Sequence, residues 1–180
     1  MNFAMIKAFD TVDGEGFRVA LYVSGCLFKC QGCHNQELWD YNHGEKFTND
    51  TLNYIYELLK YNHVSGFSIL GGEPLDPKNR EEVCNIIRKI REMCDNDPLT
   101  KKRTIWLWTG YLYEHIIEYN IIPRDVLEKI DVIVDGLFDV SQRDVSLQFR
   151  GSRNQRIISV KRSLEVNKPV CWNDGKLVVG

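Results

Sequence analysis

Three cysteines stand close together in the segment SGCLFKCQGCHNQELWD, residues 24–40. Cys26, Cys30 and Cys33 have the spacing C-x-x-x-C-x-x-C. Clustered thiolates bind soft metal ions and iron-sulfur clusters, and most cysteine-ligated sites use four protein ligands. The segment therefore predicts a metal centre that has one protein ligand fewer than usual.

Three kinds of metal group are compatible with these residues. Residues 30–34 fit C-x-x-C-H, the attachment motif of c-type haem, but haem attachment normally follows export, and the N-terminal segment carries acids where a signal peptide needs an apolar run. A zinc ion would use Cys26, Cys30, Cys33 and His34, although the adjacent Cys33 and His34 converge poorly on one small ion. An iron-sulfur cluster is larger and suits three thiolates on one irregular loop, with one iron left open to a ligand that is not protein.

The other three cysteines supply no obvious fourth ligand. Cys84 and Cys94 lie on or beside the apolar face of a predicted helix, which is typical of core thiols. Cys171 lies beside Trp172 and outside any motif.

The composition is that of a globular chain. Its 180 residues and 43% hydrophobic content predict one domain, residues 1–180, with a substantial core. The 23 basic and 25 acidic side chains give a formal net charge of −2, so no general attraction to nucleic acid or to an anionic membrane is expected. Because there is neither a signal peptide nor an apolar run of about 18 residues, we expect a cytoplasmic protein, whose clustered cysteines bind metal rather than form disulfides.

Apolar strand patterns alternate with amphipathic helical patterns along the chain. The predicted strands are residues 18–25, 66–70, 104–108 and 131–135. Helices are predicted from the caps at residues 48–50 to a point before Gly66, over residues 79–94 and 113–119, and from Pro123 onward. This β-α-β-α order predicts an α/β fold with a parallel sheet, either open or curled into a barrel or part of one.

Each predicted strand is followed by a chemically unusual loop. The loops are the cysteine segment, Gly71–Pro74 (GGEP), Thr109–Tyr111 (TGY) and Asp135–Phe138 (DGLF). In parallel α/β folds the carboxyl ends of the strands share one rim, and ligands bind there. We therefore expect these four loops to form one site.

The motifs resemble those of a known family. CLFKCQGC followed by GGEP is similar to the radical S-adenosylmethionine superfamily. The ordered blocks GEGFRVALYVSGCLFKCQGCHN, GGEPL, WTGY, VDGLF and FRGSRNQRI further resemble the activating proteins of anaerobic (class III) ribonucleotide reductases, and they lie between Asp13 and Ile157. The resemblance implies a radical-SAM-type partial (β/α)6 barrel with a parallel sheet, which suits a chain shorter than the roughly 250 residues of a full eight-fold barrel.

The resemblance also implies a chemistry. Cys26, Cys30 and Cys33 would hold one 4Fe-4S cluster, whose fourth iron is chelated by S-adenosylmethionine. One electron would cleave this cofactor to methionine and a 5′-deoxyadenosyl radical, which would remove a hydrogen atom from a glycine of the large reductase subunit. That subunit is the expected partner, and a flavodoxin or ferredoxin is the expected electron donor.

Several residues on the rim are expected to contact the cofactor. Gly71 and Gly72 lack side chains, so a ligand can approach their backbone closely. The resemblance assigns the ammonium group of the ligand to Glu73. Thr109 and Asp135 are expected ribose or methionine contacts, although ordinary strand-end turns explain both nearly as well.

Two positions depart from the family pattern. Gly32 stands where much of the superfamily has an aromatic residue beside the adenine, so only its backbone and that of His34 can meet the adenine. Arg153 stands where the activating proteins commonly have a second serine. It belongs to a basic stretch, residues 143–162, whose donors either bind the cofactor or the partner or form a solvated face.

Aromatic residues near the motifs are candidates for an apolar shell around the cluster. These residues are Phe28, Trp106, Trp108 and Tyr111. Ordinary core packing is the alternative, and Trp106 and Trp108 are expected on opposite faces of the sheet.

Other functions remain open. A 7-carboxy-7-deazaguanine synthase, which converts a small pterin-like substrate without a protein partner, also carries Gly-Glu-Gly near its start, but GCHN, WTGY and FRGS favour the activating protein. A zinc-stabilised binding domain or an iron-sulfur electron carrier would be indifferent to S-adenosylmethionine and would leave GGEP unexplained.

Overall fold

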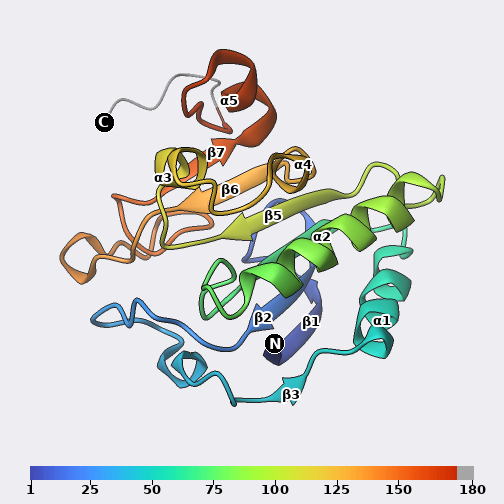
Figure 1. Ribbon diagram of the computed structural model, residues 1–180, viewed down its shortest axis with the longest axis horizontal. Coiled ribbons are helices and arrows are strands. Elements are labelled where there is room, and N and C mark those ends of the chain that lie inside the picture. The colour runs from blue at the N-terminus through green and yellow to red at the C-terminus, as the bar shows by residue number, and fades with distance from the viewer. Residues whose placement is uncertain (174–180) are drawn as a thin grey trace.

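The computed structural model describes residues 1–173 and contains one mixed sheet of seven strands (Figure 1). The strands are β1 (Asn2–Asp10), β2 (Phe17–Val23), β3 (Glu45–Lys46), β4 (Val64–Gly71), β5 (Thr104–Trp108), β6 (Val132–Asp135) and β7 (Arg156–Ser159). The helices are α1 (Asn49–Leu59), α2 (Arg80–Asp95), α3 (Tyr113–Glu118), α4 (Arg124–Leu127) and α5 (Val160–Val166). Two short 3-10 helices, η1 (Gln36–Trp39) and η2 (Val140–Gln142), lie in the loops.

The centre of the sheet is parallel and its edges are antiparallel. The strand order is β3-β1-β2-β4-β5-β6-β7, in which β2, β4, β5 and β6 run parallel. The predicted α/β class and the largely parallel, partial-barrel sheet are confirmed. Three strands that were not among the four predicted ones, β1, β3 and β7, pair antiparallel at the two edges of the sheet.

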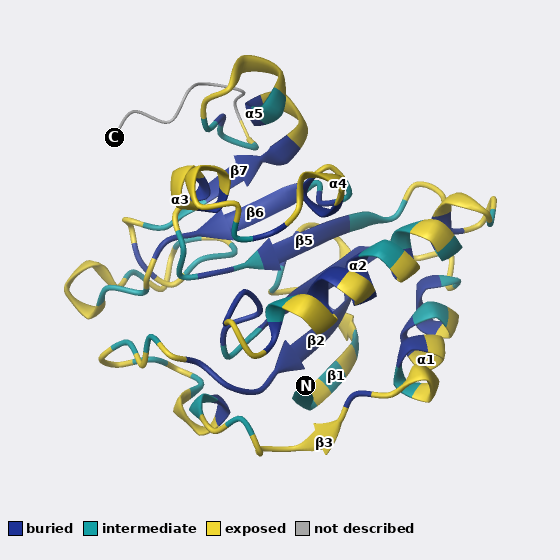
Figure 2. Cartoon of the chain, viewed as in Figure 1, coloured by how far each residue is buried: buried dark blue, intermediate teal, exposed yellow. Residues whose placement is uncertain are grey.

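Helices cover one face of the sheet, and loops cover the other. Apolar side chains of all five helices pack with strand residues such as Leu21, Ile69 and Leu107 in the main core. The opposite face carries Trp106, Val132 and other side chains, which pack against loop residues. Figure 2 shows the buried central strands between their exposed surroundings. Within residues 1–173 the second face is therefore covered by loops and by the short helix η1, whose Leu38 packs on it, and a cavity can form above it.

The register of the parallel strands aligns their carboxyl ends. Val23 of β2 pairs with Gly71 of β4, and Trp108 of β5 pairs with Val134 of β6. The next residues of each strand begin the loops that carry the motifs, and in Figure 1 the loops after β2 and β6 project from the same side of the sheet. The predicted common rim is thus present.

A buried arginine explains why glycines are needed in the Gly-Glu-Gly turn before β2. This turn lies at the end of the sheet opposite the rim. The Arg18 side chain is fully buried and donates hydrogen bonds to the carbonyl oxygens of Phe67 at 2.8 Å and Thr104 at 3.0 Å. Its guanidinium also lies 5.2 Å from the ring centroid of Trp106. Gly14 has φ +114°, and a Cβ there would lie 2.7 Å from Arg18 Cδ. This motif therefore fastens β2 to β4 and β5 rather than lining the rim.

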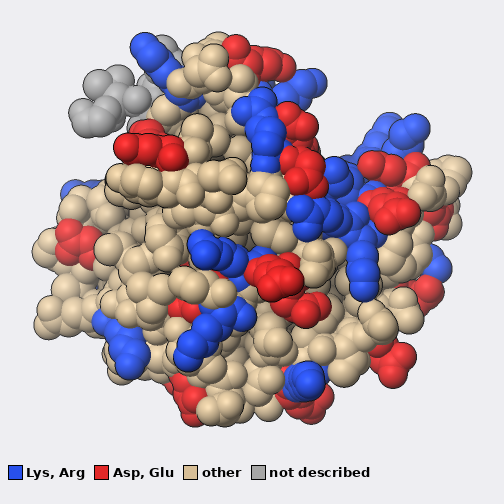
Figure 3. Space-filling model, in the orientation of Figure 1, with Lys and Arg blue, Asp and Glu red and all other residues tan. Residues whose placement is uncertain are grey.

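Charge is mixed over the face of the molecule shown in Figure 3, where basic and acidic side chains are interspersed. This agrees with the formal net charge of −2. Among residues 1–173, no helix is both long and apolar enough to cross a membrane.

Candidate active site

A cavity of about 690 Å³ lies at the rim where the parallel strands end. It is lined by the predicted loops after β2, β4, β5 and β6, and in addition by the β1–β2 loop and residues 143–155. Its volume is within the range of about 300–1,000 Å³ that is usual for small-molecule and cofactor sites. The expected convergence of the four motifs on one site is therefore present in the structure.

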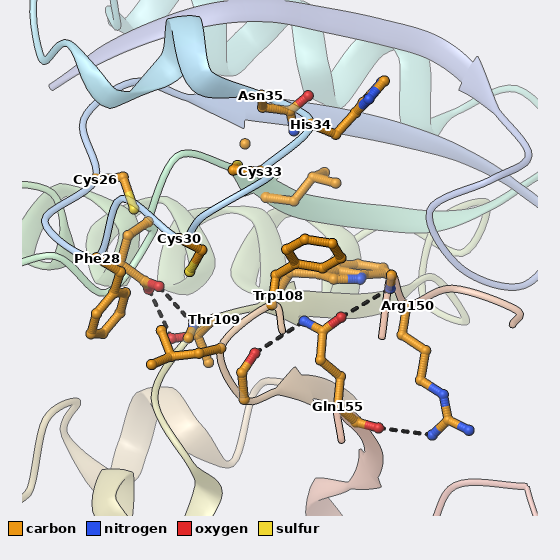
Figure 4. A pocket seen from close by; sticks show the side chains of 18 of the residues that line it. Cys26, Phe28, Cys30, Cys33, His34, Asn35, Trp108, Thr109, Arg150 and Gln155 are labelled. Carbon is orange, nitrogen blue, oxygen red and sulfur yellow. Dashed lines mark hydrogen bonds between the residues drawn. The ribbon is translucent and has the colours of Figure 1, made fainter. Parts of the chain in front are cut away.

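The three predicted cluster cysteines line this cavity (Figure 4). We call residues 24–33 the cysteine loop. Cys26 is buried and Cys30 and Cys33 are partly exposed, and all three are free thiols. A turn in which the Cys33 N–H donates to the Cys30 carbonyl at 3.1 Å, with Gly32 at φ +73°, brings these two residues to the same side of the loop. The structure thus brings together the three side chains that the spacing singled out.

The arrangement of these thiols fits a cluster better than a single ion. Within residues 1–173, no three His, Cys, Asp or Glu side chains stand close enough to hold one metal ion. Cysteine ligands of an iron-sulfur cluster bind different irons, so they do not need to converge on one point. A Cys₃His zinc site is further disfavoured because the His34 ring points away from the three cysteines in Figure 4.

Backbone amides point at two of the sulfur atoms. Burial raises the pKa of Cys26, and the N–H groups of Lys29 and Phe28 act in the opposite direction by hydrogen bonding to its sulfur. Burial likewise raises the pKa of Cys30, where the N–H of Phe138 opposes it. Such hydrogen bonds stabilise a thiolate once metal has displaced the proton, and they tune the potential of a cysteine-ligated cluster. Two of the three cysteines therefore have backbone N–H groups that favour the thiolate form in which a cluster is bound.

Glu73 is buried beside the cavity and joins two of the loops. Its Oε1 accepts hydrogen bonds from the Leu75 N–H and the Thr109 hydroxyl, both at 2.8 Å, and its Oε2 accepts one from the Gly110 N–H at 2.7 Å. Burial raises the pKa of Glu73 to about 7, against the effect of these three donors. A carboxylate has about four acceptor positions, so one remains for a donor of a ligand.

Gly71 and Gly72 allow backbone segments of the chain itself to approach each other. Gly71 has φ +112°, and a Cβ there would lie 2.7 Å from the Val23 backbone. A Cβ at Gly72 would lie 2.4 Å from the Gly25 carbonyl oxygen and 2.8 Å from that of Leu38. Gly71 thus allows the end of β4 to approach the end of β2, and Gly72 allows the loop after β4 to pack against the cysteine loop. Both glycines also line the cavity.

Phe28 of the cysteine loop packs on the loop after β5. A Cβ at Gly110 would lie 2.7 Å from the Phe28 ring and from Leu137, and the Tyr111 ring lies 4.9 Å from that of Phe28, centroid to centroid. Phe28, Thr109 and Gly110 line the cavity. These contacts place apolar surface next to the cysteines.

Gly32 and His34 lie at the cavity as well. A Cβ at Gly32 would lie 3.0 Å from a methyl carbon of Val140, on η2, and its positive φ disfavours other residues. Gly32 therefore packs the cysteine loop against the segment after β6.

Asp135 has a structural role that its motif did not indicate. Its carboxylate is fully buried, accepts a hydrogen bond from the Tyr113 N–H at 2.7 Å and forms an ion pair with Arg156, which also pairs with Glu114. Burial raises the pKa of Asp135, and the Arg156 guanidinium opposes the shift. Gly136 lines the cavity and Asp135 does not, so a direct cofactor contact by Asp135 stays a prediction without support from this geometry.

The basic stretch, residues 143–162, is not a solvated face along its whole length, because part of it forms a wall of the cavity. Gln155 holds this wall, since its side chain donates to the Gly136 carbonyl at 3.0 Å and accepts from the Gly151 N–H at 2.9 Å. Its own carbonyl accepts from Arg150 at 2.9 Å, and the Arg150 guanidinium points away from the cysteines in Figure 4. Arg153, at the position that departs from the family pattern, pairs with Asp144 at 3.0 Å.

The expectation about the two tryptophans is wrong. Trp106 and Trp108 lie on the same face of β5 with stacked rings whose centroids are 5.7 Å apart, because alternate residues of a strand project to the same side. Trp108 lines the cavity and donates its indole N–H to the Phe149 carbonyl at 2.8 Å, whereas Trp106 is buried beneath it. One of the two therefore belongs to the cavity and the other to the core.

The sequence did not indicate the residues whose side chains hold the loops of the site together. The buried Asn79 side chain donates to the carbonyl oxygens of Ser24 and Glu73, both at 3.0 Å, and so ties the cysteine loop to the GGEP loop. Asp76, Tyr41 and Gln155 make similar connections. Their partners are distant in the sequence, so no local pattern could have identified them.

Comparisons with known proteins agree with this geometry. Residues 12–158 match the family model described as "4Fe-4S single cluster domain". The chain is similar to the anaerobic ribonucleoside-triphosphate reductase-activating protein of Enterobacteria phage T4, with 37% identity over 159 residues that cover 88% of this chain and 94% of the relative. Proteins with the same description in Vibrio cholerae and Escherichia coli K12 are each 36% identical, over 87% and 86% of this chain and 97% and 96% of their own lengths. The chain therefore belongs to the family of anaerobic ribonucleoside-triphosphate reductase-activating proteins.

Proposed function

We propose that this protein activates an anaerobic ribonucleotide reductase by generating a glycyl radical on its large subunit. The observation that carries the proposal is the convergence of Cys26, Cys30, Cys33 and the GGEP loop on one cavity. The family to which the chain belongs, and its match to a 4Fe-4S cluster domain, support a radical S-adenosylmethionine enzyme. The single-domain assignment to residues 1–180 also stays a proposal, supported by the one sheet that unites β1 to β7.

Cys26, Cys30 and Cys33 would hold a 4Fe-4S cluster, and the GGEP loop would hold S-adenosylmethionine beside it. When bound, these groups supply a one-electron reductive cleavage of the sulfonium that yields a 5′-deoxyadenosyl radical able to take a hydrogen atom from glycine. The protein itself would bind these groups and orient them. Glu73, which has one acceptor position left, would accept from the ammonium group, and the backbone of Gly32 and His34, both of which line the cavity, would meet the adenine edge.

Apolar side chains of the cavity would limit access of water to the reacting groups. Phe28 comes from the cysteine loop, Trp108 from the end of β5, and Phe149 from the basic stretch. Water does not readily quench a carbon radical, so protection of the radical is not the main benefit of a dry site. The benefit is that a low dielectric constant strengthens every polar contact that orients the cofactor. The cavity is not enclosed, and we infer that a glycine-bearing segment of the reductase enters it from the surface.

A flavodoxin- or ferredoxin-type protein would supply the electron. A donor is needed because a cluster that reduces S-adenosylmethionine must itself be reduced. The mixed surface charge and the net charge of −2 support neither nucleic acid nor an anionic membrane as a partner.

Protein reconstituted anaerobically with iron and sulfide is expected to release 5′-deoxyadenosine and methionine from S-adenosylmethionine on reduction with dithionite. Chromatography of the products measures this directly. A zinc-stabilised domain or a simple electron carrier would release neither product, and that result would exclude the proposal. Turnover of a small deazapurine precursor, without any reductase, would instead favour the deazaguanine synthase alternative.

A further inference from the structure

The cysteine loop is attached to a buried carboxylate that lies outside the motifs. Asp76 Oδ2 accepts a hydrogen bond from the backbone N–H of Leu27 at 3.1 Å and another from the Tyr41 hydroxyl at 2.7 Å. Its Oδ1 accepts from the Lys78 N–H at 3.0 Å. Leu27 directly follows Cys26, so this contact fixes the peptide unit between the first cysteine and the rest of the loop.

Asp76 is itself held rigidly. The residue is 1% exposed. Its N–H donates to the Glu73 carbonyl at 3.2 Å, and its carbonyl accepts from the N–H groups of Asn79 at 2.8 Å and Arg80 at 2.9 Å, at the start of α2. Asp76 thus connects the cysteine loop, through its carboxylate, to the first turn of α2 and to the loop that carries Glu73, through its backbone.

Tyr41 holds the other side of the same peptide. A Cβ at Gly25 would lie 2.1 Å from a ring carbon of Tyr41, so the ring rests directly on the residue before Cys26. Lys78 lies over the ring, with its Nζ 4.3 Å from the centroid. Tyr41 and Asp76 therefore enclose the backbone at residues 25–27 from two directions.

We propose that Asp76 is a positioning residue for the metal centre: together with Tyr41 it holds the cysteine loop in the conformation that binds the iron-sulfur cluster. The proposal rests on the proposed cluster site at Cys26, Cys30 and Cys33. Neither Asp76 nor Tyr41 contributes a ligand. They act by removing freedom from the loop before the cluster binds, in the way that residues behind a metal ligand orient it and raise the affinity of the site.

Replacement of Asp76 tests this proposal by two measurements, which are the rate of cluster loss and the hydrogen exchange of the apo-protein. Asp76→Leu is expected to speed the loss of the cluster to a chelator by about 10- to 100-fold, the usual effect of removing a residue behind the ligands. Asp76→Asn keeps an oxygen that can accept from Leu27 and Tyr41 and loses only the acceptor of the Lys78 N–H, which lies outside the cysteine loop, so it should stay within about threefold of wild type. Tyr41→Phe should lie between the two. Bleaching of the cluster absorbance after addition of the chelator gives the rates.

The chain offers a matched control at the other end of α2. Asp97 accepts hydrogen bonds from the Leu99 N–H and from the Tyr56 hydroxyl, both at 2.9 Å, which repeats the contacts of Asp76 away from the cavity. Asp97→Leu and Tyr56→Phe should lower the melting temperature without changing the rate of cluster loss. Hydrogen exchange of apo-protein should show faster exchange of the Leu27 amide in Asp76→Leu and unchanged exchange there in Asp97→Leu.

The outcomes separate this proposal from the proposed function. Wild-type protein that binds no cluster would overturn both. A wild-type cluster that Asp76→Leu and Asp97→Leu lose at equal rates would leave the proposed function standing and overturn the positioning role. Selective cluster loss in Asp76→Leu, recovery in Asp76→Asn and selective exchange at Leu27 together support it. If Asp76→Leu fails to fold, the comparison of Tyr41→Phe with Tyr56→Phe decides, since each removes only one hydroxyl.

Discussion

Single replacement of Cys26, Cys30 or Cys33 by alanine is expected to abolish release of 5′-deoxyadenosine. Each thiolate would hold one iron of the cluster, and the three side chains come from one loop that lines the cavity. With one ligand missing, the cluster would have two open irons and would be lost or altered during reconstitution. Iron content per chain, the visible absorbance of the cluster and the yield of 5′-deoxyadenosine should therefore all fall together, to background.

Cys84→Ala and Cys94→Ala are the matched controls for these substitutions. Both thiols are buried in the main core, with 5% and 2% of their surface exposed. Removing a sulfur from the core costs some stability, about 1 kcal/mol or more, but leaves the cavity untouched. Both variants should bind the cluster and cleave S-adenosylmethionine as wild type does. Equal behaviour of all five variants would contradict the assignment of the cluster to residues 26–33.

Replacement of Glu73 by alanine is expected to impair both the fold and the chemistry. The substitution leaves the N–H groups of Leu75 and Gly110 and the Thr109 hydroxyl without their acceptor. Removing the acceptor of buried donors costs about 1–3 kcal/mol for each unsatisfied group, partly recovered by water from the cavity. We therefore expect the free energy of unfolding of apo-protein to fall by about 3 kcal/mol, as measured by urea titration, and cofactor cleavage to be lost.

Glu73→Gln separates the carboxylate charge from the shape of the side chain. Burial raises the Glu73 pKa from 4.5 to about 7 in the folded protein, so the folded state binds this proton more tightly than the unfolded chain does. The contribution of this group to stability is therefore present in full below pH 4.5 and is lost as the pH rises through about 7. The free energy of unfolding of apo-protein should decrease over that interval in wild type and less steeply in Glu73→Gln. Glu165→Gln, on the exposed surface of α5, should retain the wild-type slope.

The parallel centre of the fold was predictable because its strands are continuous apolar runs followed by loops of unusual composition. The edges were not, since β1 is mostly only partly buried and Lys7 interrupts its apolar residues, and β7 lies within a basic stretch. A parallel strand buried on both faces gives a strong signal, whereas an antiparallel edge strand gives a weak one. The convergence of the motifs followed from the strand order, and it did not require knowledge of the edges.

The detailed roles of residues in the site were harder to predict from the sequence. The sequence presents Asp135 and Arg156 as a strand-end acid and a member of a basic stretch, but in the structure they form a buried ion pair behind the rim. The GGEP glycines could be read as ligand contacts, yet both are also required by the approach of the backbone at Val23 and Gly25. Such roles depend on partners about 20 to 50 positions away, and only the folded chain brings these partners together.

The most direct test of the account is electron paramagnetic resonance of the reaction with the partner. Reconstituted protein, dithionite, S-adenosylmethionine and the large subunit of the anaerobic ribonucleotide reductase are mixed without oxygen, and the spectrum is recorded after freezing. The account predicts a glycyl radical signal on the reductase that requires S-adenosylmethionine and is absent with Cys30→Ala. Cleavage of S-adenosylmethionine without any glycyl radical would contradict the proposed partner.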